Sequence, residues 1–358
     1  MMRSENRIWV LQRAKKGEKY MGDVYPKFKA AAVMAAPVFL DREKTTEKAC
    51  HLIKEAGSKG AALVVFPEVY IPAYPYWIWL GTPTLGAPFF AELFKNAVEI
   101  PSPTTEAIGE AARKANTYVV MGINERENGT LYNTLVYFDR EGRIMNKHRK
   151  LQPTHAERTV WGRGDGSDLV VCDTQIGRIG GLICWEHTMD LVRYAMVALG
   201  EQIHAAVWPA VSALTHTPHA NFFNNITEAA VRHHALTGQV FVINVQPVID
   251  HYTIERLGMK DRLEMIKPGG GWSAIVNPHG QIIAGPITDK ESILYADLDL
   301  EEIIYAKGFC DSIGHYARPD VVRIVVNREK QTVMVSQGVR PESLSLPPKE
   351  PEPEKEFK

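Results

Sequence analysis

Apolar residues gather in short runs that alternate with longer amphipathic stretches from about residue 28 to about residue 300. Short apolar runs rich in β-branched residues are typical of buried strands. We therefore predict strands at residues 29–36, 62–66, 118–124, 131–139, 169–172, 177–183, 205–208, 240–246 and 272–277. Strands that alternate with helices in this way indicate the α/β class.

Amphipathic stretches predict helices at residues 41–58, from 103 onward, at 190–199 and at 217–236. Two of them begin with a capping signal, because Ser102 precedes Pro103 and Thr217 precedes Pro218. Gly200 is expected to end the third helix. In that helix we expect the core-facing side chains to be Leu191, Tyr194, Ala195, Ala198 and Leu199.

Asn128-Gly129 stands between two predicted strands, and Asn-Gly in that position is a strong signal for a β-hairpin. Hairpins are antiparallel, whereas strands joined through helices are parallel, so we expect mixed sheets. Residues 67–88 are rich in Pro and aromatic residues and are predicted to form a loop. No linker divides the chain before its C-terminal tail, which favours one domain.

The composition is that of an ordinary globular protein, with 45% hydrophobic and 23% charged residues. Lys plus Arg number 41 and Asp plus Glu number 42, and the resulting formal charge of −1 argues against a general nucleic-acid binder. No apolar stretch is long enough to span a membrane. Residues 1–27 lack the apolar core of a signal peptide.

The four cysteines, Cys50, Cys172, Cys184 and Cys310, lie far apart along the chain, without the spacing of a disulfide framework or a zinc site. We therefore expect a reducing compartment and a cytoplasmic protein without a targeting segment. Residues 340–358 are rich in Pro and charge, a composition typical of a disordered tail.

Gly180-Gly-Leu-Ile-Cys184 leads from a predicted strand into a cysteine, and a helix follows within a few residues. A nucleophile at such an elbow is exposed at the end of a sheet, and a nearby helix N-terminus favours the thiolate. The alternative is a structural cysteine, since free cysteines are among the most buried residues. Cys184 is thus a candidate nucleophile.

Two charged residues accompany this cysteine. Phe66-Pro-Glu68 ends a predicted strand with a carboxylate, and Lys147-His-Arg-Lys150 is a basic segment. Each is ordinarily a solvated surface feature. Their joint occurrence with Cys184, in this order and at these intervals, is a much stronger signal for a catalytic site.

With these residues the chain resembles the nitrilase superfamily, and within it the nitrilases. The resemblance covers about residues 28–322. The motifs that carry it are Phe66-Pro-Glu-Val-Tyr-Ile-Pro72, Tyr74-Pro-Tyr-Trp77, Arg149-Lys-Leu-Gln-Pro-Thr154, His155-Ala-Glu-Arg158, Trp161-Gly-Arg-Gly-Asp-Gly-Ser167, Cys184-Trp-Glu-His187 and Gly314-His-Tyr-Ala-Arg-Pro-Asp320.

This resemblance implies an α-β-β-α sandwich and a catalytic Glu–Lys–Cys triad formed by Glu68, Lys150 and Cys184. Glu157 fits the place of a second family glutamate. It also implies homo-oligomers, with dimers built through helices and extended into spirals, and no metal or organic cofactor. The implied organisation is an extension at 1–27, a carbon–nitrogen hydrolase domain at 28–322 and a C-terminal segment at 323–358.

The implied reaction is hydrolysis of an organic nitrile to its carboxylic acid and ammonia. A nitrile carbon is a poor electrophile, for which a thiolate is a suitable nucleophile. Cys184 would form a thioimidate and then a thioester, with Glu68 as general base. Lys150 would stabilise the charge that develops on the substrate, and Glu157 would hold Lys150.

Three residues are predicted to bind substrate: Tyr74, Trp185 and His187. The backbone N–H of Trp185 is also a candidate oxyanion donor. The sequence leaves the nitrile open. An amidase or carbamoylase and a cyanide hydrolase remain alternatives with the same triad. A non-catalytic filament protein of this fold is a further alternative, against which the intact triad speaks.

Histidines are frequent in the second half of the chain, at His204, His216, His219, His233 and His234. None of them has the spacing of a zincin motif, so we expect no metal site. Residues 162–167 are glycine-rich but lack the strand and helix of a phosphate loop. They are predicted to form a tight loop near the catalytic residues.

Overall fold

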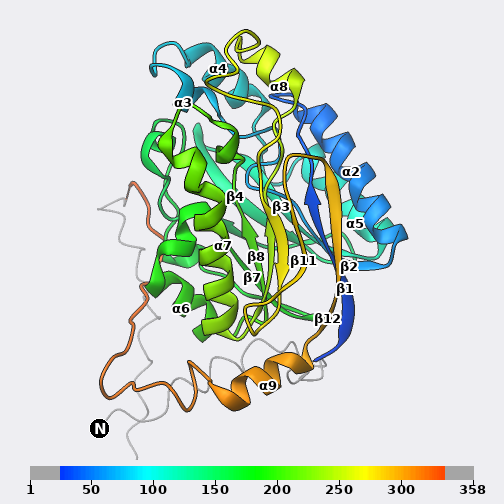
Figure 1. Cartoon of the computed structure of the whole chain (residues 1–358), viewed down its shortest axis with the longest axis vertical. Coiled ribbons are helices and arrows are strands. Elements are labelled where there is room, and N and C mark those ends of the chain that lie inside the picture. Colours follow the sequence, from blue (N-terminus) through cyan, green and yellow to red (C-terminus); the bar gives the residue numbers. More distant parts are fainter. Residues whose placement is uncertain (1–24, 335–358) are drawn as a thin grey trace, which may run out of the picture.

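The computed structural model describes residues 25–334. Nearly all of the predicted N-terminal extension, and the predicted tail from residue 340 onward, lie outside the described residues. The described part consists of two stacked sheets with helices on both outer faces (Figure 1). Among its helices, none combines the length and the apolarity that a bilayer crossing requires.

Both sheets have six strands and both are mixed, as predicted. The first runs in the order β12 (Ser292–Asp299), β1 (Lys27–Met34), β2 (Ala61–Val65), β3 (Tyr118–Glu127), β4 (Thr130–Phe138) and β5 (Ile144–Arg149). The second runs in the order β11 (Ile282–Ile287), β10 (Ser273–Val276), β9 (Phe241–Val245), β8 (Ile203–Val207), β7 (Gly177–Ile183) and β6 (Cys172–Thr174).

Two long helices cover each outer face of the stacked sheets (Figure 1). On the first sheet these are α2 (Arg42–Ser58) and α5 (Pro103–Ala115), and on the second they are α6 (Asp190–Ala198) and α7 (Pro218–Gly238). The remaining α-helices of the described part lie at the two ends of the molecule: α3 (Trp77–Leu80), α4 (Ala87–Asn96), α8 (His251–Arg256) and α9 (Glu301–Phe309). The α-β-β-α sandwich is thereby confirmed.

Strand β1 shows how the two layers of the core arise from one apolar run. Ala30 and Ala32 lie in the cluster between the sheets. Ala31 and Val33 lie in the cluster that packs the first sheet against α2 and α5. Successive side chains of a strand point to opposite faces, so a strand that is buried on both faces reads as an unbroken apolar run.

Several predicted boundaries are confirmed by their capping and turn geometry. Ser102 caps α5 and Thr217 caps α7, each by accepting a backbone N–H from the residue three positions on. The hairpin between β3 and β4 turns at Asn128 and Gly129, whose φ angles of 49° and 84° are both positive. Positive φ at both turn residues is the reason for the Asn-Gly preference.

The predicted core face of α6 is wrong. Leu191 is 70% exposed and Tyr194 is 36% exposed, whereas Arg193 is buried together with Ala195, Met196 and Val197. The buried guanidinium group of Arg193 is partnered by Asp190 and by His233, so its burial is tolerated. Of the five predicted core-facing residues, Ala195 is buried and Leu199 is partly buried, whereas Leu191, Tyr194 and Ala198 are exposed.

The region 67–88 is not only a loop, because α3 and the first residues of α4 lie within it. A four-residue helix of sequence Trp-Ile-Trp-Leu is too short and too uniformly apolar to show a helical period. The strand predicted at 169–172 begins only at Cys172. Strand β5, whose residues include the basic segment before Lys150, was not predicted, since charged residues obscure its alternation.

Candidate active site

Four predicted catalytic residues come from different parts of the chain and meet in one buried place. Glu68 follows the end of β2, Lys150 follows β5 directly, and Cys184 follows β7 directly. Glu157 lies in a short 3₁₀ helix, His155–Thr159. All four residues are at most 1% exposed. The structure therefore brings together the set that the sequence predicted.

Lys150 joins the two carboxylates. Its Nζ donates to Oε1 of Glu68 at 2.9 Å and to Oε2 of Glu157 at 2.7 Å. Glu157 also accepts the backbone N–H of Thr154 on Oε2 and the hydroxyl of Tyr74 on Oε1. An ammonium group has three N–H donors. Two are used here, and the third has no partner among the described residues, so it is available to a ligand.

Glu68 has one engaged and one free carboxylate oxygen. Its Oε1 accepts from Lys150 and, at 2.6 Å, from the side-chain amide of Asn133, while Oε2 is buried without a partner in the described part of the chain. Burial raises the pKa of Glu68 to about 7 although Lys150 opposes the rise. A carboxylate in this state is suited to general-base chemistry near neutral pH.

A glycine on the neighbouring strand allows Glu68 to occupy this position. A Cβ atom on Gly122 of β3 would lie 2.0 Å from the carbonyl oxygen of Pro67 and 2.6 Å from the backbone nitrogen of Val69. Any side chain at that position would push the segment that carries Glu68 away from β3.

Cys184 stands at a sharp elbow. The strand ends at Ile183, Cys184 has a φ of 54°, and the 3₁₀ helix Cys184–Thr188 begins at once. Burial raises the pKa of the Cys184 thiol well above its ordinary value, and Lys150 and the backbone N–H of Trp185 oppose that rise. The helix N-terminus was expected to favour the thiolate, but burial has the larger effect, so the thiol is neutral until a base takes its proton.

Glu186 and His148 hold the elbow at Cys184 against β5 and the residues that follow it. The carboxylate of Glu186 accepts the backbone N–H groups of Ile183 at 2.7 Å and Leu151 at 2.8 Å, and a ring nitrogen of His148 at 2.9 Å. Burial alone would raise the pKa of Glu186, but His148 lowers it. Sequence analysis did not find this pair, and its only signal was a charged residue two positions after the nucleophile.

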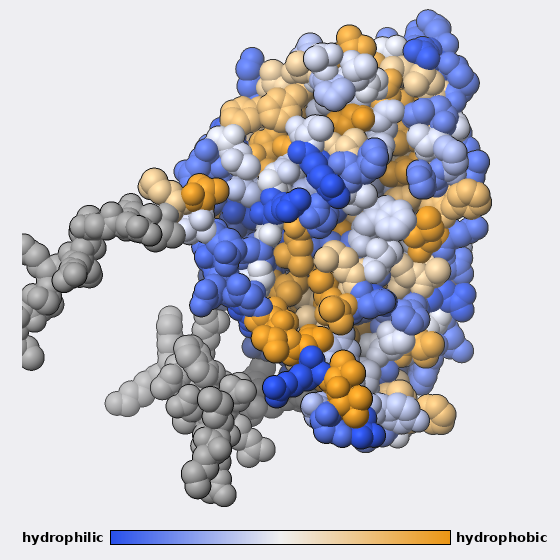
Figure 2. All heavy atoms as spheres, turned by 90° about the vertical axis from the view of Figure 1, so that its left-hand side faces the viewer, coloured by the Kyte–Doolittle hydropathy of each residue, from blue (hydrophilic) through white to orange (hydrophobic). Residues whose placement is uncertain are grey.

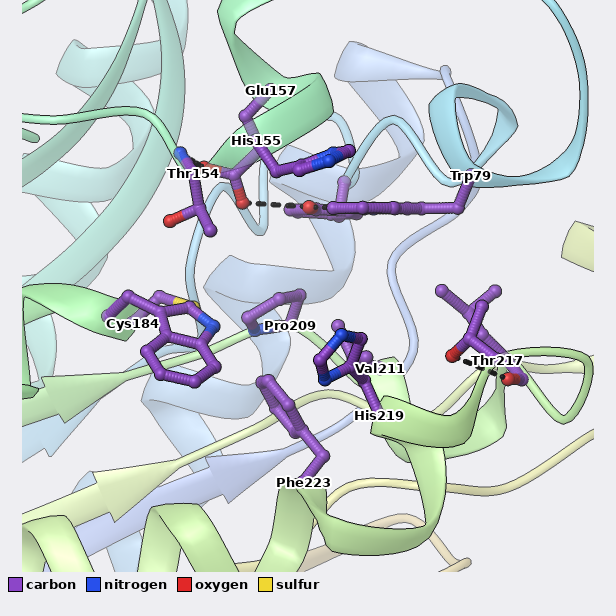
Figure 3. A pocket seen from close by; sticks show the side chains of 13 residues that line it. Trp79, Thr154, His155, Glu157, Cys184, Pro209, Val211, Thr217, His219 and Phe223 are labelled. Carbon is purple, nitrogen blue, oxygen red and sulfur yellow. Dashed lines mark hydrogen bonds between the residues drawn. The ribbon is translucent and has the colours of Figure 1, made fainter.

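The candidate site opens into a cavity of about 430 Å³. Figure 3 shows Trp79 and His155 on one side of it and His219 and Phe223 on the other, with Cys184 at its end. The two rings of Trp79 and His155 stack with centroids 5.7 Å apart. Residues that line the cavity are Tyr74, Trp79, Thr154, His155, Glu157, Cys184, Trp185, Pro209, Val211, Leu214, Thr217, His219 and Phe223.

The three predicted substrate-binding residues have different surroundings. Tyr74 and Trp185 line the cavity. His187 does not, and this part of the prediction is corrected. Its Nδ1 bonds the carbonyl oxygen of Cys184 at 2.7 Å, its Nε2 bonds His204 at 2.9 Å, and its ring stacks on Trp208. With both nitrogens occupied and the ring covered, His187 lies behind the nucleophile.

Two of the histidines considered as metal ligands are close together after all. Nitrogens of His204 and His234 and a carboxylate oxygen of Glu201 lie within 4.8 Å of one another, and all three residues are buried. The other three lie elsewhere: His216 bonds two backbone carbonyls, His219 lines the cavity and His233 bonds Arg193. Linear spacing missed the cluster because it joins the start of β8 to the far end of α7.

The glycine-rich segment 162–167 lies beside the site as a loop that leads into a short 3₁₀ helix, Gly166–Asp168. The backbone N–H of Gly164 donates to the carbonyl oxygen of Lys150 at 2.9 Å, and the indole of Trp161 donates to Asn124 at 2.9 Å. Gly164 thus fixes the backbone at Lys150, the lysine that is predicted to be catalytic.

Comparisons with known proteins agree with this geometry. A family model described as carbon-nitrogen hydrolase matches residues 29–307. The chain is 42% identical over 309 residues to an aliphatic nitrilase of Rhodococcus rhodochrous, covering 85% of this chain and 84% of that protein. It is 38% identical over 309 residues to a nitrilase of Bacillus sp. (strain OxB-1), covering 86% of this chain and 90% of that protein.

The fold is also found among solved structures. A carbon-nitrogen hydrolase from Helicobacter pylori G27 superposes with a TM-score of 0.66 at 22% identity, over 82% of this chain and 96% of that chain. The chain therefore belongs to the carbon-nitrogen hydrolase family, and to the nitrilase branch of that family. The resemblance inferred from the motifs is confirmed.

Proposed function

We propose that this enzyme hydrolyses an organic nitrile to the carboxylic acid and ammonia. The observation that carries the proposal is the buried group of Glu68, Lys150, Glu157 and Cys184 at the end of a largely apolar cavity. Relatives at about 40% identity that bear the name nitrilase support the same conclusion.

The first half of the reaction forms a thioimidate. Oε2 of Glu68, the unpartnered oxygen, takes the proton of the Cys184 thiol as the sulfur attacks the nitrile carbon. One bond of the C≡N triple bond becomes the electron pair on nitrogen, which receives the thiol proton back from Glu68 as the thioimidate forms, so Glu68 is a carboxylate again for the next step. The free N–H of Lys150 stabilises the charge on that nitrogen during attack.

The second half consumes two water molecules. Glu68 removes a proton from the first water, which adds to the thioimidate carbon, and the tetrahedral intermediate releases ammonia to leave a thioester. A second water, activated in the same way, releases the carboxylic acid and returns the thiol. The backbone N–H of Trp185 is placed next to the nucleophile and serves as a donor to the oxygen in these steps.

Glu157 holds the lysine in place. It binds Nζ at 2.7 Å and is itself fixed by Tyr74 and by the backbone of Thr154. Tyr74 in turn accepts the indole N–H of Trp79 at 3.0 Å, so the wall of the cavity and the catalytic charges form one hydrogen-bonded unit. We propose that Tyr74 and Trp185, which line the cavity, contact the substrate.

We also propose that the enzyme forms homo-oligomers through its helices. Apolar side chains gather on the face that carries α6 (Figure 2). Leu191 and Tyr194 of α6 and Phe222 of α7 are exposed there. A second copy of the chain that covers this surface would bury it. A cytoplasmic location belongs to the same proposal, because all four cysteines are free thiols.

The reaction is tested by incubating the purified chain with aliphatic and aromatic nitriles, the matching amides and cyanide, and measuring ammonia and acid. We expect acid and ammonia in equal amounts from a nitrile, and none from Cys184→Ala. Turnover of amides alone would identify an amidase, turnover of cyanide alone a cyanide hydrolase, and either result would overturn the proposal.

A further inference from the structure

A chain of buried hydrogen bonds runs from the nucleophile into the second sheet and its covering helix. The carbonyl oxygen of Cys184 is bonded to His187, and His187 to His204. Nδ1 of His204 bonds Oε2 of Glu201 at 2.9 Å, and Nε2 of His234 bonds Oε1 of Glu201 at 2.7 Å. The mechanism proposed above uses none of the four residues beyond Cys184.

These residues come from four separate elements, and each is at most 3% exposed. His187 lies in the 3₁₀ helix after the nucleophile, Glu201 in the turn after α6, His204 in β8 and His234 near the end of α7. The fold reserves space for them. A Cβ atom on Gly180 of β7 would lie 2.3 Å from Oε2 of Glu201.

The order of donors and acceptors in the chain follows from its ends. A carbonyl oxygen only accepts, so Nδ1 of His187 carries a proton. An ionised Glu201 also only accepts, so the facing nitrogens of His204 and His234 carry protons. Nε2 of His187 and Nε2 of His204 bond each other, so one of these two nitrogens also carries a proton. The two rings therefore share three protons, and the positive charge beside Glu201 balances the carboxylate.

The charges around the chain agree with this assignment. Burial alone would raise the pKa of Glu201, but His204 and His234 lower it to about 2. Burial lowers the pKa of His187 far below its ordinary value, and His204 lowers it further. Arg193 of α6 faces the same cluster and lowers the pKa of His234 in addition to burial and His204.

The backbone of Cys184, which this series of hydrogen bonds holds, is strained. A non-glycine residue with positive φ, as at Cys184, is disfavoured by sterics and persists only where its surroundings hold it. His187 holds the carbonyl of Cys184 through its Nδ1. The indole of Trp208 stacks on the His187 ring, with the two ring centroids 4.8 Å apart. The ring can then present its donor in one direction only.

Given the nucleophilic role proposed for Cys184, we infer that His187, His204, Glu201 and His234 act as positioning residues that hold the Cys184 elbow in its reactive conformation. They touch neither substrate nor the reacting atoms. They act through the single hydrogen bond that His187 donates to the carbonyl of Cys184, whose direction the other three set.

Glu201 offers a test that separates the hydrogen bonds from the charge. In Glu201→Gln the amide donates to Nδ1 of His204 and accepts from His234, so every bond to Cys184 survives with all rings neutral. In Glu201→Leu, His204 and His234 lose the carboxylate to which they are bonded. We expect kcat close to wild type for Glu201→Gln. For Glu201→Leu we expect an unchanged KM and a kcat lower by about a hundredfold, the effect of misplacing a reacting group.

His187 provides a second pair with the same logic. Asn at 187 places an amide N–H where Nδ1 stands, whereas Gln places its amide near the position of Nε2. We expect His187→Asn to retain clearly more activity than His187→Gln. Thr45→Val is the matched control on α2, the helix that covers the other sheet, because it removes the bonds between the buried Thr45 hydroxyl and the backbone of Val38, at 3.0 and 2.9 Å, and neither residue lines the cavity. It should lower the melting temperature and leave kcat unchanged.

The outcomes are decisive either way. Full activity in Glu201→Leu and His187→Gln would overturn the positioning role, and so would equal losses in Glu201→Gln and Glu201→Leu. If Glu201→Leu does not fold, the His187 pair decides. One equivalent of metal bound to the purified protein and lost in Glu201→Gln would replace the hydrogen bonds by a metal site. Activity in Cys184→Ala would overturn the proposed function itself.

Discussion

Replacing Lys150 by Arg keeps the positive charge of the site and changes only its shape. Lysine carries a compact ammonium group with its donors on one nitrogen atom, whereas arginine carries a wide, planar guanidinium group. In this site Nζ of Lys150 lies 2.9 Å from Oε1 of Glu68 and 2.7 Å from Oε2 of Glu157. Each of the three side chains is at most 2% exposed. Lys150 itself does not line the cavity, so the wider guanidinium group has to displace the buried side chains around it.

The structure sets the size of the expected loss. A guanidinium that spans the two carboxylates uses its donors on them and no longer directs one N–H at the substrate nitrogen. Removing a charge-stabilising donor from an active site typically costs about 2.7–4 kcal/mol, or roughly a hundred- to a thousandfold in kcat. Overpacking adds about 1–3 kcal/mol of destabilisation. We therefore expect Lys150→Arg to be folded and nearly inactive.

Lys147→Arg is the matched control. Lys147 is the other lysine of the same segment, its side chain is 30% exposed, and it pairs with Glu125. That carboxylate keeps two bonds from Arg149, at 2.8 and 2.6 Å, whatever happens at residue 147. An arginine reaches the same carboxylate from the half-open position, so we expect activity and melting temperature close to wild type.

Three measurements check this prediction together. Ammonia release gives kcat and KM, the thermal melting curve shows whether the variant folds, and the rate of iodoacetamide labelling at Cys184 reports on the nucleophile. Comparable kcat in Lys150→Arg and Lys147→Arg would refute the reasoning, because a solvated basic segment tolerates both changes. A loss in both would show that the segment matters only for folding.

Three further predictions follow from the same geometry. Because the pKa of Glu68 is raised to about 7, kcat/KM should rise with pH through neutrality as the carboxyl group loses its proton, and a profile that stays flat there would remove Glu68 as the base. Prolonged dialysis against a chelator should leave activity unchanged; loss that zinc restores would make the enzyme metal-dependent. Leu191→Glu should reduce the oligomer size seen by sedimentation, whereas Leu85→Glu, at an equally exposed leucine, should not.

The residues that the sequence predicted as catalytic do lie together in the structure, and there is a physical reason why a sequence can indicate such a group. Glu68, Lys150 and Cys184 each stand at or just past the end of a strand, and their residue types are those that the chemistry needs. Each one also lies in a short motif that can be read from the sequence: Phe66-Pro-Glu68, Lys147-His-Arg-Lys150 and Cys184-Trp-Glu-His187. Local signals of this kind survive in a linear sequence.

What the sequence did not reveal depends on contacts between distant segments. The partners of His187 come from β8, α7 and the turn after α6, and no spacing rule joins them. For the same reason the core face of α6 was misassigned: Arg193 is buried only because His233 and Asp190 supply partners. Periodicity counts apolar residues and does not register polar groups that are satisfied across the fold.

Charge balance explains why these groups are buried together. With Glu68 ionised and Cys184 a thiol, the two carboxylates and the ammonium sum to −1 in a site closed to solvent. When Glu68 takes the thiol proton, the negative charge moves to sulfur and the sum stays at −1. The protein thus avoids the large cost of creating a new buried charge during the step. Lys150 contacts the carboxylate that gives up this charge. In the proposed reaction the same ammonium group also stabilises the charge on the substrate nitrogen, so its position has to serve both ends of the transfer.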